Sequence, residues 1–222
     1  MLDRSDLEQK IGYVFKNKEL LEQALTHSSY SNEHEAQDYE RLEFLGDALL
    51  DYVAADLLFN MYPDKKEGEL TKIRAGLVKE DTLSKIADEL SLTSYARFSQ
   101  TKQSNPIAAS KAVKCDLFEA VIGAVLIDSN KDMVLLTRMI NTFLKPYFNI
   151  DYTDYKSQLL ELLAQNKLSY RFEFEGSFDP KNPVYRVNLY INDKKVTNGE
   201  GQNKRSAERD ACKKYFDQLF KK

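Results

Sequence analysis

An all-α domain followed by a smaller α+β domain is the fold that the sequence predicts. Up to about residue 148, apolar residues recur at three- and four-residue spacing, which is the period of amphipathic helices. Beyond residue 154, two segments alternate polar and apolar residues like half-buried strands, SYRFEFEG (169–176) and PVYRVNLYI (183–191). We therefore expect a multidomain chain, with an all-α domain over 1–148, a linker over 149–153 and an α-β-β-β-α domain over 154–222.

The helices of the first region are separated by residues that break helices. Pro63, Gly68, Asn105 and Pro106 interrupt the helical pattern, and the segment Asp128-Ser129-Asn130 marks a stop and a new start. The polar stretch 100–110 is expected to be a loop. Helices are expected over residues 3–10, 18–26, 37–61, 69–90, 111–128 and 131–148.

The second region begins and ends with a helix. The first helix is expected over 154–166 and precedes the two alternating strands. A short third strand over 193–199 should follow a turn at Asn192-Asp193. The last helix is expected over 203–220.

Composition and charge limit the class of protein. With 42% apolar and 30% charged residues over 222 positions, the chain is long enough to bury two cores. No run of about 18 apolar residues occurs, and the N-terminal MLDRSDLEQK is polar and acidic, so neither a membrane span nor a secretory signal is expected. Cys115 and Cys212 lack a CxxC partner, so we expect a reduced, cytoplasmic protein without a zinc site.

The net charge of −3 conceals a difference between the two regions. Residues 154–222 hold 14 Lys and Arg against 10 Asp and Glu, whereas residues 1–153 hold 18 against 25. An acidic body with a basic C-terminal domain can bind a polyanion locally while it stays acidic as a whole.

The segment ERLEFLGDALLDY (40–52) places four acids on one face of a predicted helix. At about 100° per residue, they fall within an arc of about 80°, opposite an apolar face. An acidic helix face is most often simply solvated. The four acids are Glu40, Glu43, Asp47 and Asp51, and the opposite face holds Leu42, Leu45, Leu49 and Val53.

A second acidic pair favours a functional interpretation. The segment KCDLFEAVIGAVLID (114–128) is strongly apolar, yet it contains Asp116 and Glu119, and buried carboxylates need compensation. Gly123 on the same face would let another helix approach closely. If the two acidic faces meet, Glu43, Asp47 and this pair converge, and two like charges 4 Å apart repel by about 4 kcal/mol at an effective dielectric of 20. Such a cluster of oxygen ligands favours Mg²⁺ or Mn²⁺.

Phe44 lies on the acidic side of its helix, about 40° from Glu40. It therefore cannot enter the core behind the helix. Two interpretations stay open for its side chain, exposure to solvent or a contact with another subunit.

These motifs together resemble those of bacterial ribonuclease III, the double-strand-specific endoribonuclease. ERLEFLGDALLDY resembles the signature of that family, and three further segments resemble family motifs in the same order. The resemblance covers essentially the whole chain. The three segments are ALTHSSY (24–30), EGELTKIRAGLV (67–78) and CDLFEAVIGAVLIDS (115–129).

The resemblance implies roles for particular residues. It implies that Phe44 inserts into the other subunit of a homodimer. The sequence neighbours decide the expectation for the two histidines. Leu25 and Tyr30 indicate a helix end that turns into the core, so His27 is expected to be a packed structural residue rather than a general base. His34, among acidic residues, is expected at the surface. Asp51 matches no residue of the family set. Metal ligation is implied for Glu43, Asp47, Asp116 and Glu119, catalysis for Asp47 and Glu119, and support from Glu40 and Glu67.

The resemblance also implies a reaction. Double-stranded RNA would be cleaved by a metal-activated water, with Mg²⁺ as the cofactor, Mn²⁺ as a substitute and no small-molecule cofactor. The products would carry a 5′-phosphate and a 3′-hydroxyl, with a short 3′ overhang. Ribosomal RNA precursors and structured messenger RNAs are the implied substrates.

The segment GEGQNKRSAERDA (199–211) predicts an anion-binding helix start. Asn203 is a plausible N-cap, and the basic side chains of the first two turns would meet phosphate together with free N–H groups. The 154–222 region resembles a double-stranded RNA-binding domain, which reads A-form shape. The resemblance implies RNA contacts by Gln165, Asn182, Asn203, Lys204, Arg205 and Arg209.

Some positions depart from the pattern of that domain. Leu160 stands where Gln is frequent, and Asn203 stands where Ser is usual. In the loop before the second strand, Asn182 stands in a segment where a His is frequent. Two alternatives to a nuclease are a non-cleaving double-stranded RNA-binding module and a purely structural helical protein, and the latter leaves Asp116 and Glu119 unexplained.

Overall fold

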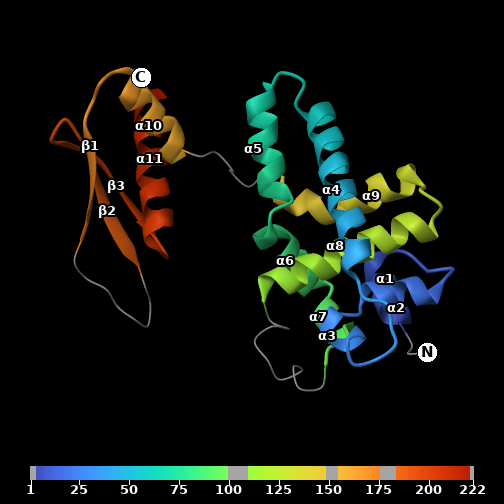
Figure 1. Cartoon of the computed structure of the whole chain (residues 1–222). Helices are drawn as coiled ribbons and strands as arrows, with labels where there is room; N and C mark the ends of the chain where they lie inside the picture. Colours follow the sequence, from blue (N-terminus) through green and yellow to red (C-terminus); the bar gives the residue numbers. More distant parts are fainter. Residues whose placement is uncertain (1–3, 100–109, 149–154, 176–183, 221–222) are drawn as a thin grey trace. The chain divides into compact units, whose positions relative to one another are not determined.

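The chain folds into two compact units, Met1–Tyr152 and Thr153–Lys222 (Figure 1). The structure is a computed structural model that describes residues 4–99, 110–148, 155–175 and 184–220. The predicted linker 149–153 and most of the predicted 100–110 loop lie outside the described residues. No helix in the described part of the chain is long and apolar enough to cross a membrane.

The N-terminal unit is helical, as the apolar periodicity predicts. Two short helices, α3 and α7, were not expected, and they flank segments joined by a parallel bridge between Thr26 and Arg97. The elements are α1 Ser5–Ile11, α2 Lys18–Ala24, α3 Ser28–Ser31, α4 Glu40–Met61, α5 Glu67–Leu77, α6 Glu80–Glu89, α7 Leu92–Tyr95, α8 Lys111–Asp128, α9 Met133–Leu144 and the 3₁₀ turn η1 Lys145–Tyr147.

The prediction of one helix over 69–90 is wrong, because the chain breaks between α5 and α6. Lys79 adopts an extended conformation there, with φ −72° and ψ 155°. The Thr82 hydroxyl donates to the Gly76 carbonyl at 2.9 Å, which satisfies a carbonyl near the end of α5. The break lets Leu77 and Leu83, both fully buried, reach the same core from two helices of different direction.

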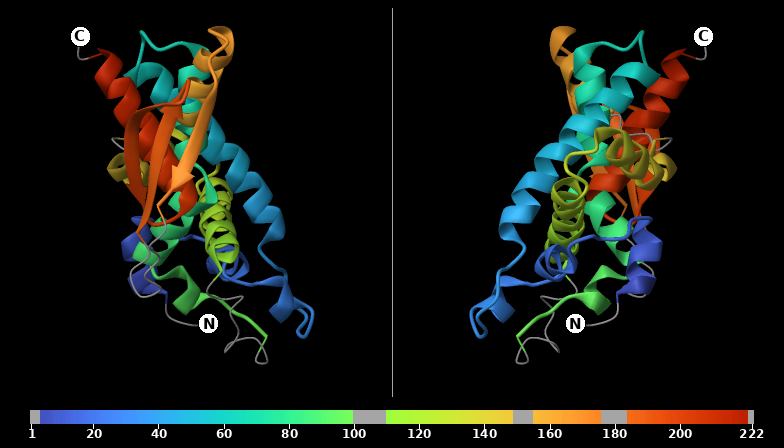
Figure 2. Two further views of the ribbon diagram at one scale, coloured as in Figure 1. Left: turned by 90° about the vertical axis from the view of Figure 1, so that its left-hand side faces the viewer. Right: turned by 90° about the vertical axis from the view of Figure 1, so that its right-hand side faces the viewer.

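Helices α4 and α8 cross at the centre of the N-terminal unit (Figures 1 and 2). Every residue from 117 to 126 of α8 is buried, which explains its apolar sequence. Two glycines bring the helix backbones together. A Cβ atom at Gly46 would lie 1.8 Å from the Glu119 carbonyl oxygen, and one at Gly123 would lie 2.1 Å from the Leu42 carbonyl oxygen. The prediction that Gly123 permits close approach is confirmed.

The C-terminal unit has the predicted α-β-β-β-α order. Its antiparallel sheet has the strand order β1-β2-β3, and α10 and α11 pack on one face of it (Figure 1). Asn192 and Asp193 both have positive φ, 47° and 63°, as a tight hairpin turn requires. The elements are α10 Tyr155–Gln165, β1 Tyr170–Phe174, β2 Tyr185–Ile191, β3 Lys194–Gly201 and α11 Lys204–Phe220.

The Gly-x-Gly segment that precedes α11 is required by packing. A Cβ atom at Gly199 would lie 2.2 Å from the Ala207 carbonyl oxygen, and one at Gly201 would lie 2.2 Å from the Ser206 hydroxyl oxygen. Strand β3 can therefore lie directly against the first turns of α11, so the basic start of that helix is held at the edge of the sheet.

Candidate metal centre and nucleic-acid interface

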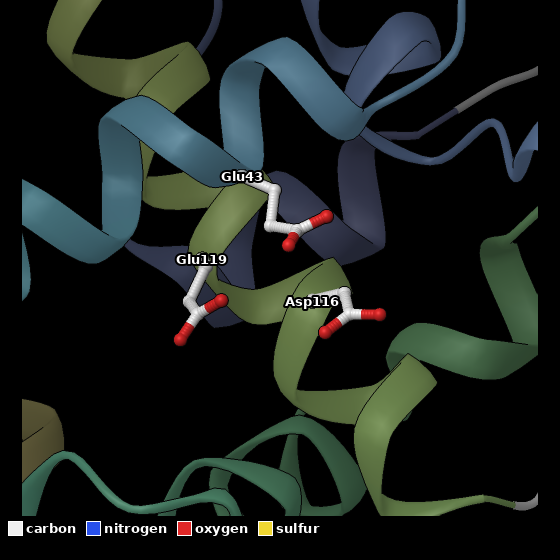
Figure 3. A group of neighbouring side chains, drawn as sticks. All are labelled: Glu43, Asp116 and Glu119. Carbon is white, nitrogen blue, oxygen red and sulfur yellow. The ribbon is translucent and has the colours of Figure 1, made fainter.

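Three carboxylates from two helices converge in the N-terminal unit. Glu43 comes from α4, and Asp116 and Glu119 come from α8. Each offers an oxygen, and these oxygens all lie within 4.8 Å of one another. Figure 3 shows the Glu43 carboxylate pointing from its helix toward the pair on α8. The sequence-based expectation that the two acidic faces meet is correct for these three residues, which we call the carboxylate cluster.

The cluster depends on the close crossing of α4 and α8. Gly46 lies one turn after Glu43 and against the backbone of Glu119, so the two helices approach without intervening side chains. Glu119 is consequently buried, with 8% of its surface exposed, and Glu43 and Asp116 are half-buried.

Burial and mutual repulsion oppose ionisation of these acids. Burial, with smaller contributions from Asp116, Glu40 and Asp47, raises the pKa of Glu43 to about 7. Burial is also the largest cause that raises the pKa of Glu119 to about 7, and it raises the pKa of Asp116. Near neutral pH the cluster must therefore hold protons or gain a cation.

The hydrogen-bond donors that reach the two α8 carboxylates are neutral. The Tyr39 hydroxyl donates to Asp116 Oδ2 at 3.4 Å, and the Cys115 thiol donates to Glu119 Oε1 at 3.4 Å. Neither donor neutralises the negative charge. Among the described residues, no positive side chain forms an ion pair with these three carboxylates. Carboxylate oxygens are the donor set that a hard divalent cation such as Mg²⁺ requires, so the residues fit such an ion.

The other predicted acids are placed differently. Asp47 is exposed one turn after Glu43, near enough to raise the pKa values of Glu43 and Glu119, but its carboxylate is not among the three that converge. Glu40, the first residue of α4, is also exposed and raises the pKa of Asp116.

Glu67 lies outside the carboxylate cluster. It is the first residue of α5 and lines a separate pocket of about 540 Å³ together with Tyr52 and Phe59 of α4. The Thr71 hydroxyl donates to its carboxylate at 2.8 Å. Asp51 instead forms an ion pair with Arg74 of α5 at 3.6 Å, so it belongs to the contact between α4 and α5.

Both histidine rings pack against neighbouring aromatic rings. His27 caps α3, where its Nδ1 accepts from the Ser29 N–H at 2.9 Å. Its ring packs against Tyr39 and Phe98. His34 is exposed and stacks on Tyr30, with ring centroids 4.0 Å apart.

The basic residues at the start of α11 form the candidate nucleic-acid interface. Asn203 is the predicted N-cap, since its Oδ1 accepts from the Ser206 N–H at 2.8 Å. Lys204, Arg205 and Arg209 are exposed along the first two turns of α11. Gln165, the last residue of α10, is also exposed, and Asn182 lies outside the described residues.

Sequence reasoning missed several residues that contact the predicted ones. Lys204 Nζ lies 5.4 Å from the centroid of the Phe174 ring, at the end of β1. Tyr39 and Cys115 donate to the cluster, although no sequence pattern predicts a role there for either of them. Only the position of Tyr39 directly before the acidic segment could have drawn attention to it.

Each of the two units matches a known protein family or motif. Residues 17–145 match the protein family described as Ribonuclease-III-like, and residues 155–219 match the double-stranded RNA binding motif. The chain belongs to the ribonuclease III family. The predicted family and fold class, an all-α nuclease domain followed by an α-β-β-β-α RNA-binding domain, are confirmed, and the comparisons support an endoribonuclease that acts on double-stranded RNA.

Full-length relatives and a solved structure agree with this membership. Ribonuclease 3 of Listeria monocytogenes is 35% identical to this chain, with 97% of both chains covered. Ribonuclease 3 of Borreliella burgdorferi is 37% identical, with 90% of this chain and 84% of the relative covered. The nuclease domain of ribonuclease III from Campylobacter jejuni, whose structure concerns flexibility in a region involved in dimer formation, superposes with a TM-score of 0.61 at 35% identity. The match covers 67% of this chain and 100% of that domain.

Proposed function

We propose that this ribonuclease III-family chain is a cytoplasmic, Mg²⁺-dependent endoribonuclease that works as a homodimer, with Mn²⁺ as a substitute metal. It hydrolyses both strands of double-stranded RNA and leaves 5′-phosphate and 3′-hydroxyl ends with a short 3′ overhang. Its proposed substrates are ribosomal RNA precursors and structured messenger RNAs. The observation that carries the proposal is the convergence of Glu43, Asp116 and Glu119 within 4.8 Å.

The acidic residues at and beside the carboxylate cluster have different proposed roles. Glu43, Asp116 and Glu119 hold the cation, and Asp47 joins them from the exposed turn that faces the substrate. When bound, a divalent cation lowers the pKa of a coordinated water and stabilises the charge on the departing oxygen. Burial of Glu119 matters because electrostatic interactions strengthen where water is excluded. Glu40, exposed beside the cluster, adds negative charge that supports cation binding.

The C-terminal unit supplies affinity for the substrate. Lys204, Arg205 and Arg209 bind phosphates at the start of α11, and Asn203 orders the backbone there. Gln165 and Asn182 contact the minor groove. Such contacts follow A-form shape rather than sequence, and the affinity they give falls steeply with salt.

An exposed aromatic stripe on α4 supports the homodimer. Phe44, Tyr52 and Phe59 are 79%, 62% and 70% exposed. At about 100° per residue they lie within an arc of about 80° on one face. Large exposed apolar surfaces of this kind mark interaction sites. Since Phe44 follows Glu43 directly, the proposed contact would bring the second subunit beside the carboxylate cluster.

A cleavage assay on a perfect RNA duplex tests the proposal. The wild-type protein and Glu119→Gln are compared with Mg²⁺ and with Ca²⁺, and the product ends are mapped. We expect Mg²⁺-dependent cuts with 5′-phosphate ends in the wild type, and RNA binding without cleavage in the variant. Binding without cleavage by the wild type in either metal would instead identify a non-cleaving RNA-binding module.

A further inference from the structure

The hydroxyl of Tyr39 reaches the carboxylate cluster from the protein interior. Tyr39 is the residue before α4, and only 4% of its surface is exposed. Its hydroxyl donates to Asp116 Oδ2 at 3.4 Å, a long contact that joins the start of α4 to α8. None of the roles described above uses this residue.

The backbone and ring of Tyr39 are fixed by their surroundings. Its N–H donates to the Thr26 carbonyl at 2.9 Å, and its carbonyl accepts from the N–H groups of Leu42 and Glu43 at 2.8 and 2.9 Å. Its ring meets His27 edge-on, with centroids 5.7 Å apart. A buried ring held in this way has few alternative rotamers, so its hydroxyl stays directed at Asp116.

A neutral donor suits a cation site better than a charged one. A Lys or Arg at this place would neutralise Asp116 and compete with the cation for it. Burial and the neighbouring acids Asp116, Glu43 and Glu40 raise the pKa of Tyr39 well above its ordinary value, so it stays a neutral O–H donor. Its hydrogen bond favours the charged form of Asp116 and lowers the pKa of that carboxyl, against the larger effect of burial.

We propose that Tyr39 is a positioning residue for the cation site, whose hydroxyl orients the Asp116 carboxylate toward Glu43 and Glu119. The inference rests on the proposed function, because it requires a cation at the cluster. Residues that orient a metal ligand commonly change metal affinity by about 10- to 100-fold. The length of this contact places the expected effect of removing it lower, at about 3- to 10-fold.

The test compares two Tyr→Phe variants of the full-length protein. Tyr39→Phe keeps the ring and removes only the hydroxyl. Tyr13→Phe is the matched control, because its hydroxyl donates to Asp128 Oδ2 at 2.8 Å near the other end of the same helix α8. Mn²⁺ binding is titrated calorimetrically in the absence of RNA, and melting temperatures are measured in EDTA. Cleavage is then followed as a function of Mn²⁺ concentration.

We expect Tyr39→Phe to bind Mn²⁺ about 3- to 10-fold more weakly, with cleavage restored at saturating Mn²⁺, and Tyr13→Phe to bind like the wild type. Unchanged Mn²⁺ affinity in Tyr39→Phe overturns the proposal, even if its melting temperature falls, because the role is then structural only. An equal loss of affinity in both variants also overturns it, since general loosening of α8 would explain both.

If the wild type binds no Mn²⁺, or binds it no better than Glu119→Gln does, both the proposed function and the positioning role of Tyr39 are refuted. By contrast, Mn²⁺ binding that is lost in Glu119→Gln and unaffected in Tyr39→Phe ends the positioning role alone.

Discussion

Replacing Glu119 with glutamine should stabilise the metal-free protein at alkaline pH while it abolishes cleavage. Burial raises the pKa of this carboxyl from 4.5 to about 7. Between these values the folded protein holds a proton that the unfolded chain has released, so stability falls as pH rises from about 4.5 to about 7. Above about pH 7 the wild type carries the full free-energy cost of burying the ionised Glu119 carboxylate, and glutamine removes this cost.

The size of the effect follows from the shift. At about 1.4 kcal/mol per pH unit, raising a pKa from 4.5 to about 7 corresponds to roughly 3 kcal/mol. Solvent and mobile ions near the half-exposed neighbours of Glu119 screen part of this, which leaves about 1 to 2 kcal/mol. For a unit of this size, that free energy corresponds to a rise in melting temperature of about 2 to 6 °C.

Scanning calorimetry of the full-length protein in EDTA at pH 8 and pH 5 measures this shift. At pH 5 the wild-type carboxyl is already protonated, so the two melting temperatures should converge. Glu161→Gln, an exposed substitution on α10, controls for the change in net charge. Added Mg²⁺ should stabilise the wild type and not the variant, because only the native wild type binds it.

Two results would refute this reasoning. One is a melting temperature of Glu119→Gln below that of the wild type at pH 8. The other is an increase of the same size at pH 5 and pH 8, because a pH-independent gain cannot come from a carboxyl that titrates near pH 7.

Three further substitutions test the packing, the dimer and the RNA interface. Gly46→Ala places a methyl group 1.8 Å from the Glu119 carbonyl oxygen, so urea unfolding should show that the free energy of unfolding falls by about 3 kcal/mol or more. A decrease below about 1 kcal/mol would contradict the close helix crossing. Phe44→Ala should convert a sedimenting dimer to monomer without lowering the monomer's stability, because the side chain is 79% exposed, and an unchanged sedimentation coefficient would disprove the contact. Lys204→Ala should weaken binding to RNA duplexes of any sequence and reduce the salt slope by about 1. Lys214→Ala, which removes an ion pair with Asp210 later in α11, should change the slope less, and equal slopes for Lys204→Ala and the wild type would count against the phosphate contact.

Local pattern was sufficient for much of the architecture. The three- and four-residue period placed α4 and α8 to within a few residues, because each helix must bury one apolar side. The two-residue alternation placed β1 and β2, and in β2 the alternating residues Val187, Leu189 and Ile191 are buried. Local pattern failed between α5 and α6, because neither Val78 nor Lys79 is a residue that breaks helices. The need of the two helices to reach one core decides the break there.

For the carboxylate cluster, too, local sequence predicts one part and tertiary packing decides the other. The sequence alone indicates that Asp116 and Glu119 require compensation, because they lie in a strongly apolar segment of a helix. Tertiary structure decided which acids meet them, since the close crossing at Gly46 brings in Glu43 and leaves Asp47 exposed beside the three. It also decided the donors that hold the pair, because the hydroxyl of Tyr39 reaches Asp116 from 77 residues away in the chain, a distance that no local spacing can encode.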